Sequence, residues 1–488
     1  MYLGFDLGTS EIKAVVINNS GSIIATANEP LTVQRPHPHW SEQDPQQWWQ
    51  ATLKVVEQLM RKIPQQWPQI QAIGLSGQMH GAVLLDNNQQ ILRPAILWND
   101  TRSDTQCKTL TDKAPQLHQI TGNLAMPGFT APKLLWISEN EPEIFARINK
   151  VLLPKDYLRL RLTGAMVSDM SDAAGTLWLD VAKRDWSDAI LDACGLNRSH
   201  MPSLVEGSEI SALLRRELAA EWGLSSKVVV AGGGGDNAAS AVGIGAIEPG
   251  DAFISLGTSG VIFAVNDTFR PNPKSAVHAF CHALPQRWHQ MSVMLTAASA
   301  LRWLCNLLGT KEAELIAQIE QLSDAALQHA PLFLPYLSGE RTPHNSPSAT
   351  GEFHRLTHDS DAASLGYAVL EGVSFGLLDG LNVLREAGTQ INQCSLVGGG
   401  ARSRFWAQLL ADILQIRIVC HQGSEAGGAL GAARLGLLAC GGNLQSVCKK
   451  PPVTAVYEPN PDRSDTLQYR YQLFQQFYRQ QVDSTHNQ

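Results

Sequence analysis

The sequence Leu7-Gly8-Thr9-Ser10 decides the fold, because it returns as Leu256-Gly257-Thr258-Ser259. The two copies lie about half of the 488-residue chain apart. An apolar, strand-like run precedes and follows each copy: Tyr2–Phe5 and Ala14–Ile17 for the first, Ala252–Ile254 and Val261–Val265 for the second. Matching context at this spacing favours a duplicated domain over a chance match of four residues.

Signals for helices lie between the strand-like runs in both halves of the chain. Asp44 is expected to cap a helix that has Pro45 at its first position. Four apolar side chains then recur at helical spacing and are expected to face a core: Trp49, Leu53, Val56 and Met60. Ser403 is expected to cap a second such helix, which carries Trp406, Leu409, Leu410 and Ile413. Strands mixed with helices of this length indicate an α/β fold.

Turns divide this α/β chain. Asn19–Gly21 separates two strand-like runs and predicts a β-hairpin. Ile247–Gly250, just before the second copy of the repeat, is the expected domain boundary. The chain would then consist of an N-terminal domain, residues 1–247, and a C-terminal domain, residues 248–488, that ends in a helical tail.

Composition and charge argue against several classes of protein. Hydrophobic residues make up 44% of the chain, which argues against global disorder. Lys and Arg number 38 against 45 Asp and Glu, a formal charge of −7, whereas nucleic-acid binders usually carry a basic surface. The eight Cys show no Cys-x-x-Cys pair and indicate reduced thiols in a cytoplasmic protein. The acidic charge therefore makes nucleic acid an unexpected partner. No signal peptide or long apolar run is visible, so a membrane is not an expected partner either.

Glycine-rich turns are the main chemical signal. The chain has no Gly-Lys pair, hence no Walker A loop, and no complete Gly-x-Gly-x-x-Gly. Four glycine-rich turns instead follow apolar runs: Asp6–Ser10, Gly232–Asp236, Gly257–Gly260 and Gly398–Ala401. Backbone N–H groups in such turns, with small hydroxyls beside them, can surround phosphate oxygens. Four such turns in one α/β chain point toward the binding of nucleotide phosphates.

Two acids accompany these turns, Asp6 at the end of the first strand and Asp236 after four glycines. A carboxylate presented in this way can hold Mg²⁺ through water, or accept the proton of an attacking hydroxyl. Asp236 also precedes Asn237–Ala241, a good start for a helix, so a capping role is an equal alternative from spacing alone.

A third candidate site is Ile73–Gly81, in which polar residues stand between glycines at the end of a strand. Such a segment suits a pocket for a small molecule. For His80, the alternative is a structural histidine with its hydrogen bonds satisfied inside the protein.

With these motifs in place, the chain resembles the FGGY family of carbohydrate kinases. The similar segments run from Tyr2 to about Leu438: Asp6–Ser10, Trp40–Pro45, Ser76–Gly81, Leu97–Asp100, Pro127–Trp136, Leu153–Tyr157, Asp169–Thr176, Gly233–Asn237, Ser255–Gly260, Gly339–His344 and Leu396–Arg402. The resemblance implies two actin-like, ribonuclease-H-like domains with the active site and ATP in the cleft between them. That expectation agrees with the internal repeat.

The resemblance also implies roles for individual residues. Asp236 would be the catalytic base, and Asp6 the acid that organises Mg²⁺, through water, and the phosphates. Met79 and His80 would contact the sugar, with Asn237 beside the base. The turns expected to bind ATP contribute Gly8, Thr9, Gly257, Thr258, Gly399 and Gly400.

The function implied is ATP-dependent phosphorylation of D-xylulose to D-xylulose 5-phosphate, a step of xylose catabolism. Gln78–Gly81 resembles the segment that separates family members acting on xylulose from those acting on glycerol or ribulose. One alternative is a family kinase for another ketose or polyol: L-xylulose, ribulose or glycerol. The other is an ATP-binding regulator or ATPase of the actin and heat-shock-chaperone class. A homodimer is expected from the resemblance alone.

The chain departs from the family at three places. It has four glycines, 232–235, before Asp236, where close relatives often have three. It has Arg355 where the family usually has Gly, and Tyr367 where an Arg is common. The extra glycine would either shift the base or simply lengthen the turn, and Arg355 and Tyr367 leave the details of the second domain open, although every expected chemical residue is present.

Overall fold

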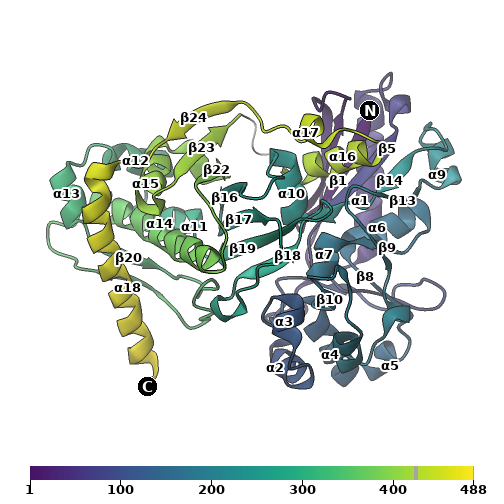
Figure 1. Ribbon diagram of the computed structural model, residues 1–488, viewed down its shortest axis with the longest axis horizontal. Coiled ribbons are helices and arrows are strands. Elements are labelled where there is room, and N and C mark those ends of the chain that lie inside the picture. The colour runs from purple at the N-terminus through teal and green to yellow at the C-terminus, as the bar shows by residue number, and fades with distance from the viewer. Residues whose placement is uncertain (423–426, 487–488) are drawn as a thin grey trace.

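The protein folds into two lobes, as the computed structural model in Figure 1 shows. The structure describes residues 1–422 and 427–486. Each lobe is built on a seven-stranded mixed sheet. We call residues 1–244 with 427–448 the first lobe, and residues 252–422 with 453–486 the second lobe, because these segments pack together.

The first sheet has the strand order β13-β14-β5-β1-β2-β3, with β15 also paired to β5. β1 runs antiparallel to β2 and parallel to β5, and β2 and β3 form the predicted hairpin. The strands are β1 (Tyr2–Leu7), β2 (Glu11–Ile17), β3 (Ile23–Pro30), β5 (Ala72–Gly77), β13 (Ile210–Leu213), β14 (Val229–Ala231) and β15 (Gly234–Gly235).

The second sheet repeats this plan in the order β18-β19-β17-β16-β22-β23-β24. β16 runs antiparallel to β17 and parallel to β22, just as β1 does with β2 and β5. The duplication inferred from the repeat is therefore confirmed in the strand pairing. The strands are β16 (Ala252–Leu256), β17 (Gly260–Asn266), β18 (His278–Cys281), β19 (Trp288–Met294), β22 (Gln393–Val397), β23 (Arg417–His421) and β24 (Val453–Tyr457).

Shorter elements complete both lobes. The remaining strands are β4 (Glu42–Gln43), β6 (Val83–Leu85), β7 (Ala95–Ile96), β8 (Lys150–Leu152), β9 (Val167–Asp169), β10 (Leu179–Asp180), β11 (Asp185–Trp186), β12 (Ser203–Val205), β20 (Leu332–Pro335) and β21 (Gly351–His354). The shorter helices are α2 (Asp104–Lys113), α3 (Leu117–Thr121), α4 (Thr130–Asn140), α5 (Pro142–Phe145), α6 (Pro154–Thr163), α7 (Met170–Ala174), α8 (Asp188–Ala193), α9 (Arg216–Glu221), α11 (Ala298–Leu308), α12 (Glu312–Ile319), α13 (Asp324–His329) and α17 (Leu444–Val447).

Both helix caps expected from the sequence are present. Asp44 accepts a hydrogen bond from the Gln46 N–H (2.9 Å) at the start of α1 (Pro45–Lys62). Ser403 accepts one from the Trp406 N–H (3.1 Å) at the start of α15 (Arg404–Leu414), and the four predicted core residues of that helix are buried.

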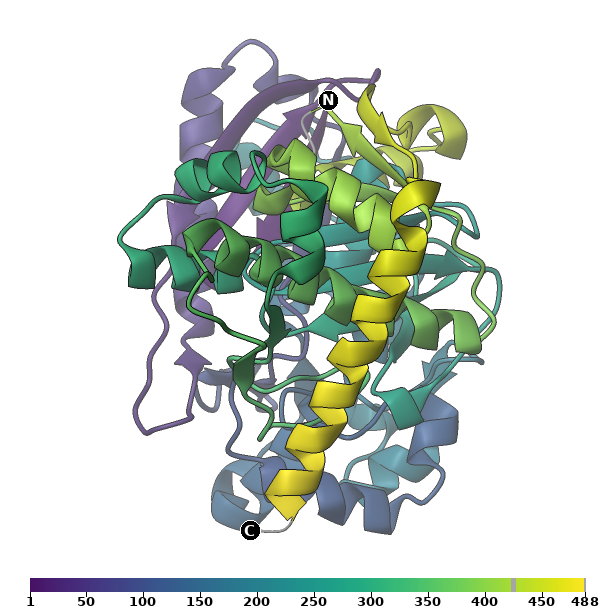
Figure 2. The ribbon, with the colours of Figure 1, turned by 90° about the vertical axis from the view of Figure 1, so that its left-hand side faces the viewer.

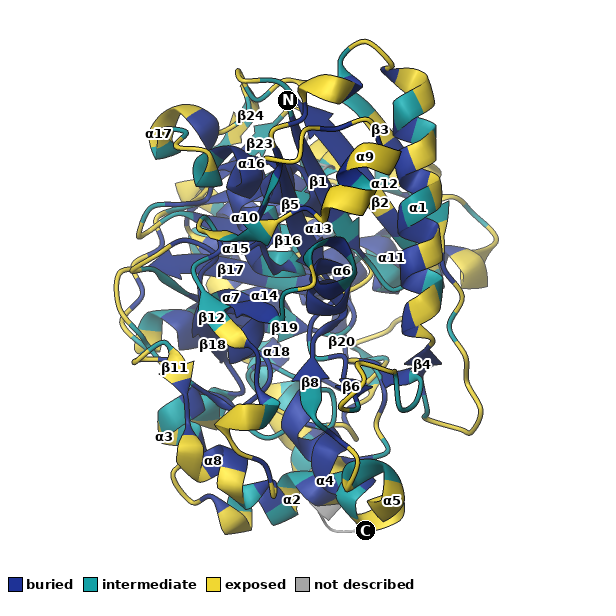
Figure 3. Ribbon diagram, turned by 90° about the vertical axis from the view of Figure 1, so that its right-hand side faces the viewer, coloured by how far each residue is buried: buried dark blue, intermediate teal, exposed yellow. Residues whose placement is uncertain are grey.

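The buried stripe of α1 lies slightly off the predicted one. Trp49 and Val56 are buried, but Leu53 and Met60 are only partly buried. The most deeply buried side chains lie one position earlier on the helix: Trp48, Thr52, Val55 and Leu59. Figure 3 shows the alternation of buried and exposed positions along this helix. The predicted and the observed positions have the same spacing, so the pattern predicted the correct helical period but placed the buried face one residue too late, about 100° around the helix.

Two helices lie between the lobes, α10 (Asp236–Ile244) and α16 (Gly427–Ala439). α16 lies between β23 and β24 of the second sheet in sequence, yet it packs on β1 and β5 of the first sheet. Two glycines permit this contact, because a Cβ at Gly4 or Gly74 would collide with the main chain of α16. The expected boundary at residues 247–248 stays a prediction, and it falls in the loop between α10 and β16.

Two long helices stabilise the second lobe. Among the described residues, α14 (Ala362–Glu386) alone is long and apolar enough to cross a membrane. However, 89% of its most apolar 18-residue stretch is buried inside the protein. α18 (Ser464–His486) runs along the outside of this lobe (Figure 2). Its Arg470 forms an ion pair with the buried Glu371 of α14 (2.6 Å), so the helical tail expected from the sequence is anchored to the core.

Candidate active site

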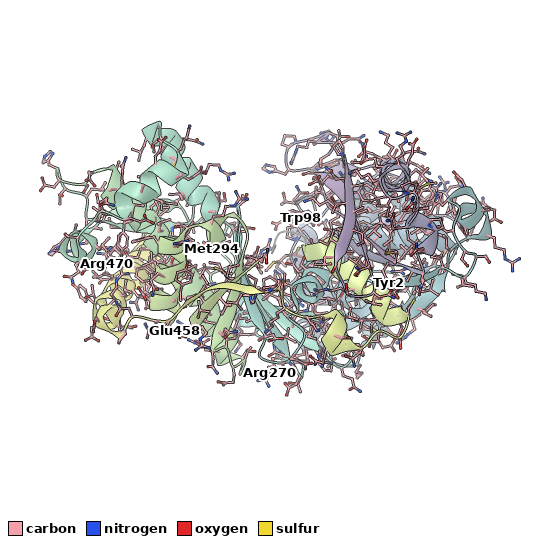
Figure 4. The ribbon with its side chains drawn as sticks, turned by 90° about the horizontal axis from the view of Figure 1, so that it is seen from above. Tyr2, Trp98, Arg270, Met294, Glu458 and Arg470 are labelled. Carbon is pink, nitrogen blue, oxygen red and sulfur yellow. The ribbon has the colours of Figure 1, made fainter. Side chains whose placement is uncertain are left out.

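A cleft of about 420 Å³ opens between the two lobes. Its walls come from both sheets and both central helices, and they include Asp6, Asn237, Ser255, Gly398, Gly399 and Gly428. Figure 4 shows the lobes from above, with Trp98 at the edge of the first lobe and Met294 in the second. The carboxyl ends of β1, β16 and β22 meet at this cleft, which is where α/β folds usually bind ligands.

Asp6 lies near the carboxyl end of β1. Ser76, at the equivalent position of neighbouring β5, donates a hydrogen bond to its Oδ1 (2.8 Å). The first turn of α16 lies against the same carboxylate, because a Cβ at Gly428 would collide with it. Burial raises the pKa of Asp6, and the Ser76 hydrogen bond partly opposes that increase.

Asp236 is the first residue of α10, and it does not cap this helix. The N-cap is Gly235, whereas the Asp236 carboxylate accepts hydrogen bonds from the N–H (2.7 Å) and the Nδ2 (2.9 Å) of Asn237. Burial and, to a smaller extent, the nearby Asp6 carboxylate raise the pKa of Asp236 to about 6, against the effect of the two hydrogen bonds. A base with a raised pKa, close to a second carboxylate, is typical of a catalytic site.

Met79 and His80 lie against Gly175, and Met79 also reaches the residue before this acid. The Met79 side chain packs over Gly235, where an added Cβ would come within 2.9 Å of its Sδ. The His80 Nδ1 lies 2.6 Å from the Gly175 carbonyl oxygen, which can only accept, so Nδ1 carries the proton and Nε2 is an acceptor. Burial lowers the pKa of His80 to about 3, and the ring is therefore neutral.

The histidine also joins the two lobes. Its ring packs against Phe129 (4.7 Å between centroids) and lies 6.4 Å from Phe280 on β18 of the second sheet. His80 has a positive φ of 70°, a strained backbone that often occurs at functional sites. The Nδ1 hydrogen bond is of the kind a structural histidine makes, while Nε2 keeps its capacity to accept a hydrogen bond, so the role of His80 toward the sugar stays a prediction.

The turns expected to bind ATP differ in how they meet the cleft. Gly398 and Gly399 line it, and Gly399 has no neighbour within 4 Å of an added Cβ. Gly400 is buried against Leu256. Gly257 and Thr258 form the β16–β17 turn, and their carbonyl oxygens accept hydrogen bonds from the start of α11. All these nucleotide-binding roles stay predictions.

The first turn is partly occupied by internal hydrogen bonds. The Gly8 N–H donates to the Glu11 carbonyl oxygen (3.0 Å). The Thr9 hydroxyl donates to Gln78 (2.9 Å) and accepts from the Trp98 indole (3.0 Å). In this conformation the Thr9 side chain links the turn to the Gln78–Gly81 segment, and its predicted contact with ATP is untested.

Several cleft residues escaped the sequence analysis. Ser240, one helical turn after Asp236, lines the cleft, as do Phe253 and Ser255 on alternate positions of β16. The helical and strand periods counted from Asp236 and from the second repeat would have found them. Ser76 was inside a quoted motif, but its bond to Asp6 follows from the register of β1 and β5.

Two of the three departures from the family have a structural account. Arg355 has a positive φ of 63°, so its backbone takes the conformation that favours glycine. Tyr367 is buried in α14, where its hydroxyl donates to Glu371 (3.1 Å) and accepts from Arg463 (3.3 Å). Both lie in the second lobe, outside the residues that line the cleft.

Two duplicated α/β lobes, with glycine turns and Asp6 lining the cleft between them and Asp236 near Asp6, define the actin-like class of ATP-dependent phosphotransferases. Residues 1–243 match the N-terminal domain, and residues 252–440 the C-terminal domain, of the FGGY family of carbohydrate kinases. The chain belongs to this family, and the resemblance seen in its sequence is confirmed.

Individual relatives agree with that assignment. The chain is 53% identical over 482 residues to the xylulose kinase of Escherichia coli (strain K12), covering 98% of this chain and 99% of the relative. A crystal structure described as a "xyloylose kinase" from Brucella ovis is similar with a TM-score of 0.96, 50% identity and 99% coverage of both chains. The xylulose kinase structure from Rhodospirillum rubrum matches with a TM-score of 0.91 at 27% identity, again over 99% of both chains.

Proposed function

We propose that this protein transfers the γ-phosphoryl group of ATP to the C5 hydroxyl of D-xylulose, forming D-xylulose 5-phosphate and ADP. The observation that carries the proposal is that Met79 packs over Gly235, the residue before Asp236, and that His80 lies beside Met79 against Gly175. Asn237, the residue after Asp236, lines the cleft between the lobes. The names and similarity of the relatives support the choice of sugar.

Asp236 is the base in this mechanism. Its carboxylate accepts the proton of the C5 hydroxyl while that oxygen bonds to the γ-phosphorus and the bond from phosphorus to the β,γ-bridging oxygen breaks. The two hydrogen bonds from Asn237 orient the carboxylate. The Nε2 atom of neutral His80 accepts a hydrogen bond from another sugar hydroxyl, while Met79 covers the apolar face of the sugar.

The acid pair also fits Mg²⁺. The Asp6 carboxylate lines the cleft and is only partly exposed, and this partial burial raises its pKa. The second carboxylate, that of Asp236, lies nearby. Oxygen ligands of this kind suit Mg²⁺, which usually retains several waters. Asp6 would hold the ion through water, and the ion would neutralise charge on the phosphates of ATP.

The proposal also covers the cellular location, the partners and the oligomeric state of the enzyme. All eight cysteines lie in the described part of the chain and are free thiols, which supports a cytoplasmic location. We expect a small sugar as the partner, neither nucleic acid nor a membrane, and a homodimer as the form in solution.

A coupled assay for ADP release across five substrates tests this function. D-xylulose should give the highest kcat/KM among D-xylulose, L-xylulose, D-ribulose, L-ribulose and glycerol. A clear preference for another compound would refute the choice of substrate. ATP turnover that does not depend on any sugar would instead favour the regulator or ATPase alternative.

A further inference from the structure

Beneath the glycine turn that carries Asp236 lies a cluster of five charged side chains, all fully buried: Lys155, Asp156, Arg159, Asp169 and Asp172. The Lys155 Nζ lies 2.7 Å from Asp156 Oδ1, 2.7 Å from Asp169 Oδ1 and 3.0 Å from Asp172 Oδ2. Burial raises the pKa of Asp172 well above its usual value, and the Lys155 ammonium opposes that increase. Such a network is rigid when its charges are paired.

Arg159 of this cluster holds the beginning of the turn. Its Nη1 donates to the carbonyl oxygen of Ala231 (2.5 Å), the last residue of β14, and its Nη2 donates to the carbonyl oxygen of Gly232. Its Nε also donates to the Val167 carbonyl oxygen (3.0 Å) on β9. The first of the four glycines is therefore held by a buried guanidinium.

Ser171 holds the end of the turn. The Gly235 N–H donates to the Ser171 Oγ (3.1 Å), and this hydroxyl donates in turn to Asp169 Oδ2 (2.5 Å). Asp169 is the residue whose other oxygen, Oδ1, pairs with Lys155. One continuous path of hydrogen bonds and ion pairs thus runs from the buried cluster to the residue immediately before Asp236.

A turn of four glycines needs such support, because glycine loses more conformational freedom on ordering than any other residue. Gly233 has a φ of 79°, so the turn uses backbone states that are open to few other residues. A catalytic group must be held within a fraction of an ångström of its productive position. The fourth glycine is therefore accommodated within a turn held at both ends.

We propose that Ser171, fixed by Asp169, is a positioning residue that holds the Asp236 carboxylate in place for proton transfer. The inference rests on the proposed role of Asp236 as base. Ser171 does not touch the sugar, so its loss should affect the chemical step and leave substrate binding nearly unchanged.

The chain offers a matched control in Ser168. This serine is as fully buried as Ser171 and lies three residues before it on β9, but its hydroxyl makes no hydrogen bond within the described structure. Ser171→Ala and Ser168→Ala remove the same atom from the same neighbourhood. Ser171→Cys nearly keeps the volume of the side chain, but its sulfur is only a weak hydrogen-bond acceptor. This variant is used instead if Ser171→Ala does not fold.

The test measures kcat and KM for D-xylulose and ATP, with circular dichroism to verify folding. In Ser171→Ala we expect kcat to fall about tenfold to a hundredfold, with both KM values within about threefold of wild type. Ser168→Ala should retain the wild-type kcat. A folded Ser171→Ala with kcat within about threefold of wild type overturns the inference, as does an equal loss in Ser168→Ala.

Asp236→Ala, measured alongside, separates the two hypotheses. If it is inactive while Ser171→Ala is unimpaired, only the positioning role fails. If Asp236→Ala keeps near-wild-type activity, the proposed base and the positioning role both fail.

Discussion

At the scale of single residues, the chemistry of Asp236 comes from its surroundings. An exposed aspartate has a low pKa and is a weak base, whereas burial and the Asp6 carboxylate raise the pKa of Asp236 to about 6. This value keeps the group deprotonated at neutral pH and yet makes it a better proton acceptor. His80 shows the opposite shift, because burial favours its neutral form.

The pKa of Asp236 sets the expected dependence of activity on pH. Only the deprotonated carboxylate can accept the sugar proton, so kcat/KM for D-xylulose should fall as the pH decreases through about 6 and level off above it. The measurement is a pH profile at saturating ATP, with circular dichroism to exclude unfolding at the acidic end. A kcat/KM that stays constant down to pH values of about 5 would be inconsistent with Asp236 as base.

The pattern of residues predicted some parts of the site better than others. Asp6 and Asp236 were recognisable because each ends a strand-like run beside glycines. Ser171 and Arg159 were not, because their partners, Gly235 and Ala231, are distant in sequence. Their contacts depend on how α7 packs on β15 and α6 packs on β14. Hydrogen-bond networks of this kind leave no periodic signal.

At the scale of elements, the position of α16 does not follow from its own residues. Its run of small residues, Gly427–Ala433, is typical of close packing, but it does not indicate which sheet the helix covers. The structure places it on β1 and β5, with its first turn against Asp6. Local helix propensity does not predict such a contact, because it joins segments that lie near opposite ends of the chain.

Gly74 tests this helix–sheet contact. An added Cβ would overlap the main chain of α16 at Ala432, so Gly74→Ala should lower the free energy of unfolding by about 1–3 kcal/mol. The same displacement would disturb the cleft beside Asp6, and KM for ATP should rise. Chemical denaturation and steady-state kinetics measure the two effects.

Gly436 of the same helix provides the control. A Cβ there would come no closer than 3.4 Å to its nearest neighbour, the Gly74 nitrogen. Because alanine favours a helix over glycine by about 1 kcal/mol, Gly436→Ala should be neutral or stabilising. An equal loss of stability in both variants would show that the close approach at Gly74 is not the cause.

At the scale of the whole molecule, the duplicated lobes explain how the site is assembled. The strand order of the first sheet recurs in the second, and the fold expected from the repeated Leu-Gly-Thr-Ser is confirmed. Phosphoryl transfer to a sugar must exclude water as a competing acceptor. A cleft lined by both lobes can do so by closing once the substrates are bound.

Closure is measurable in solution. Small-angle X-ray scattering should give a smaller radius of gyration when D-xylulose and a non-hydrolysable ATP analogue are both present than for the free protein. Glycerol in place of D-xylulose serves as the control and should have less effect. An identical radius of gyration in all three states would argue against lobe closure.

The most direct test of the central claim is the activity of Asp236→Ala with D-xylulose and ATP. Loss of the general base should reduce kcat by about 10²–10⁴-fold, while the variant still binds ATP in a calorimetric titration. If its activity remains within about tenfold of wild type, Asp236 is not the base and the proposed mechanism is wrong.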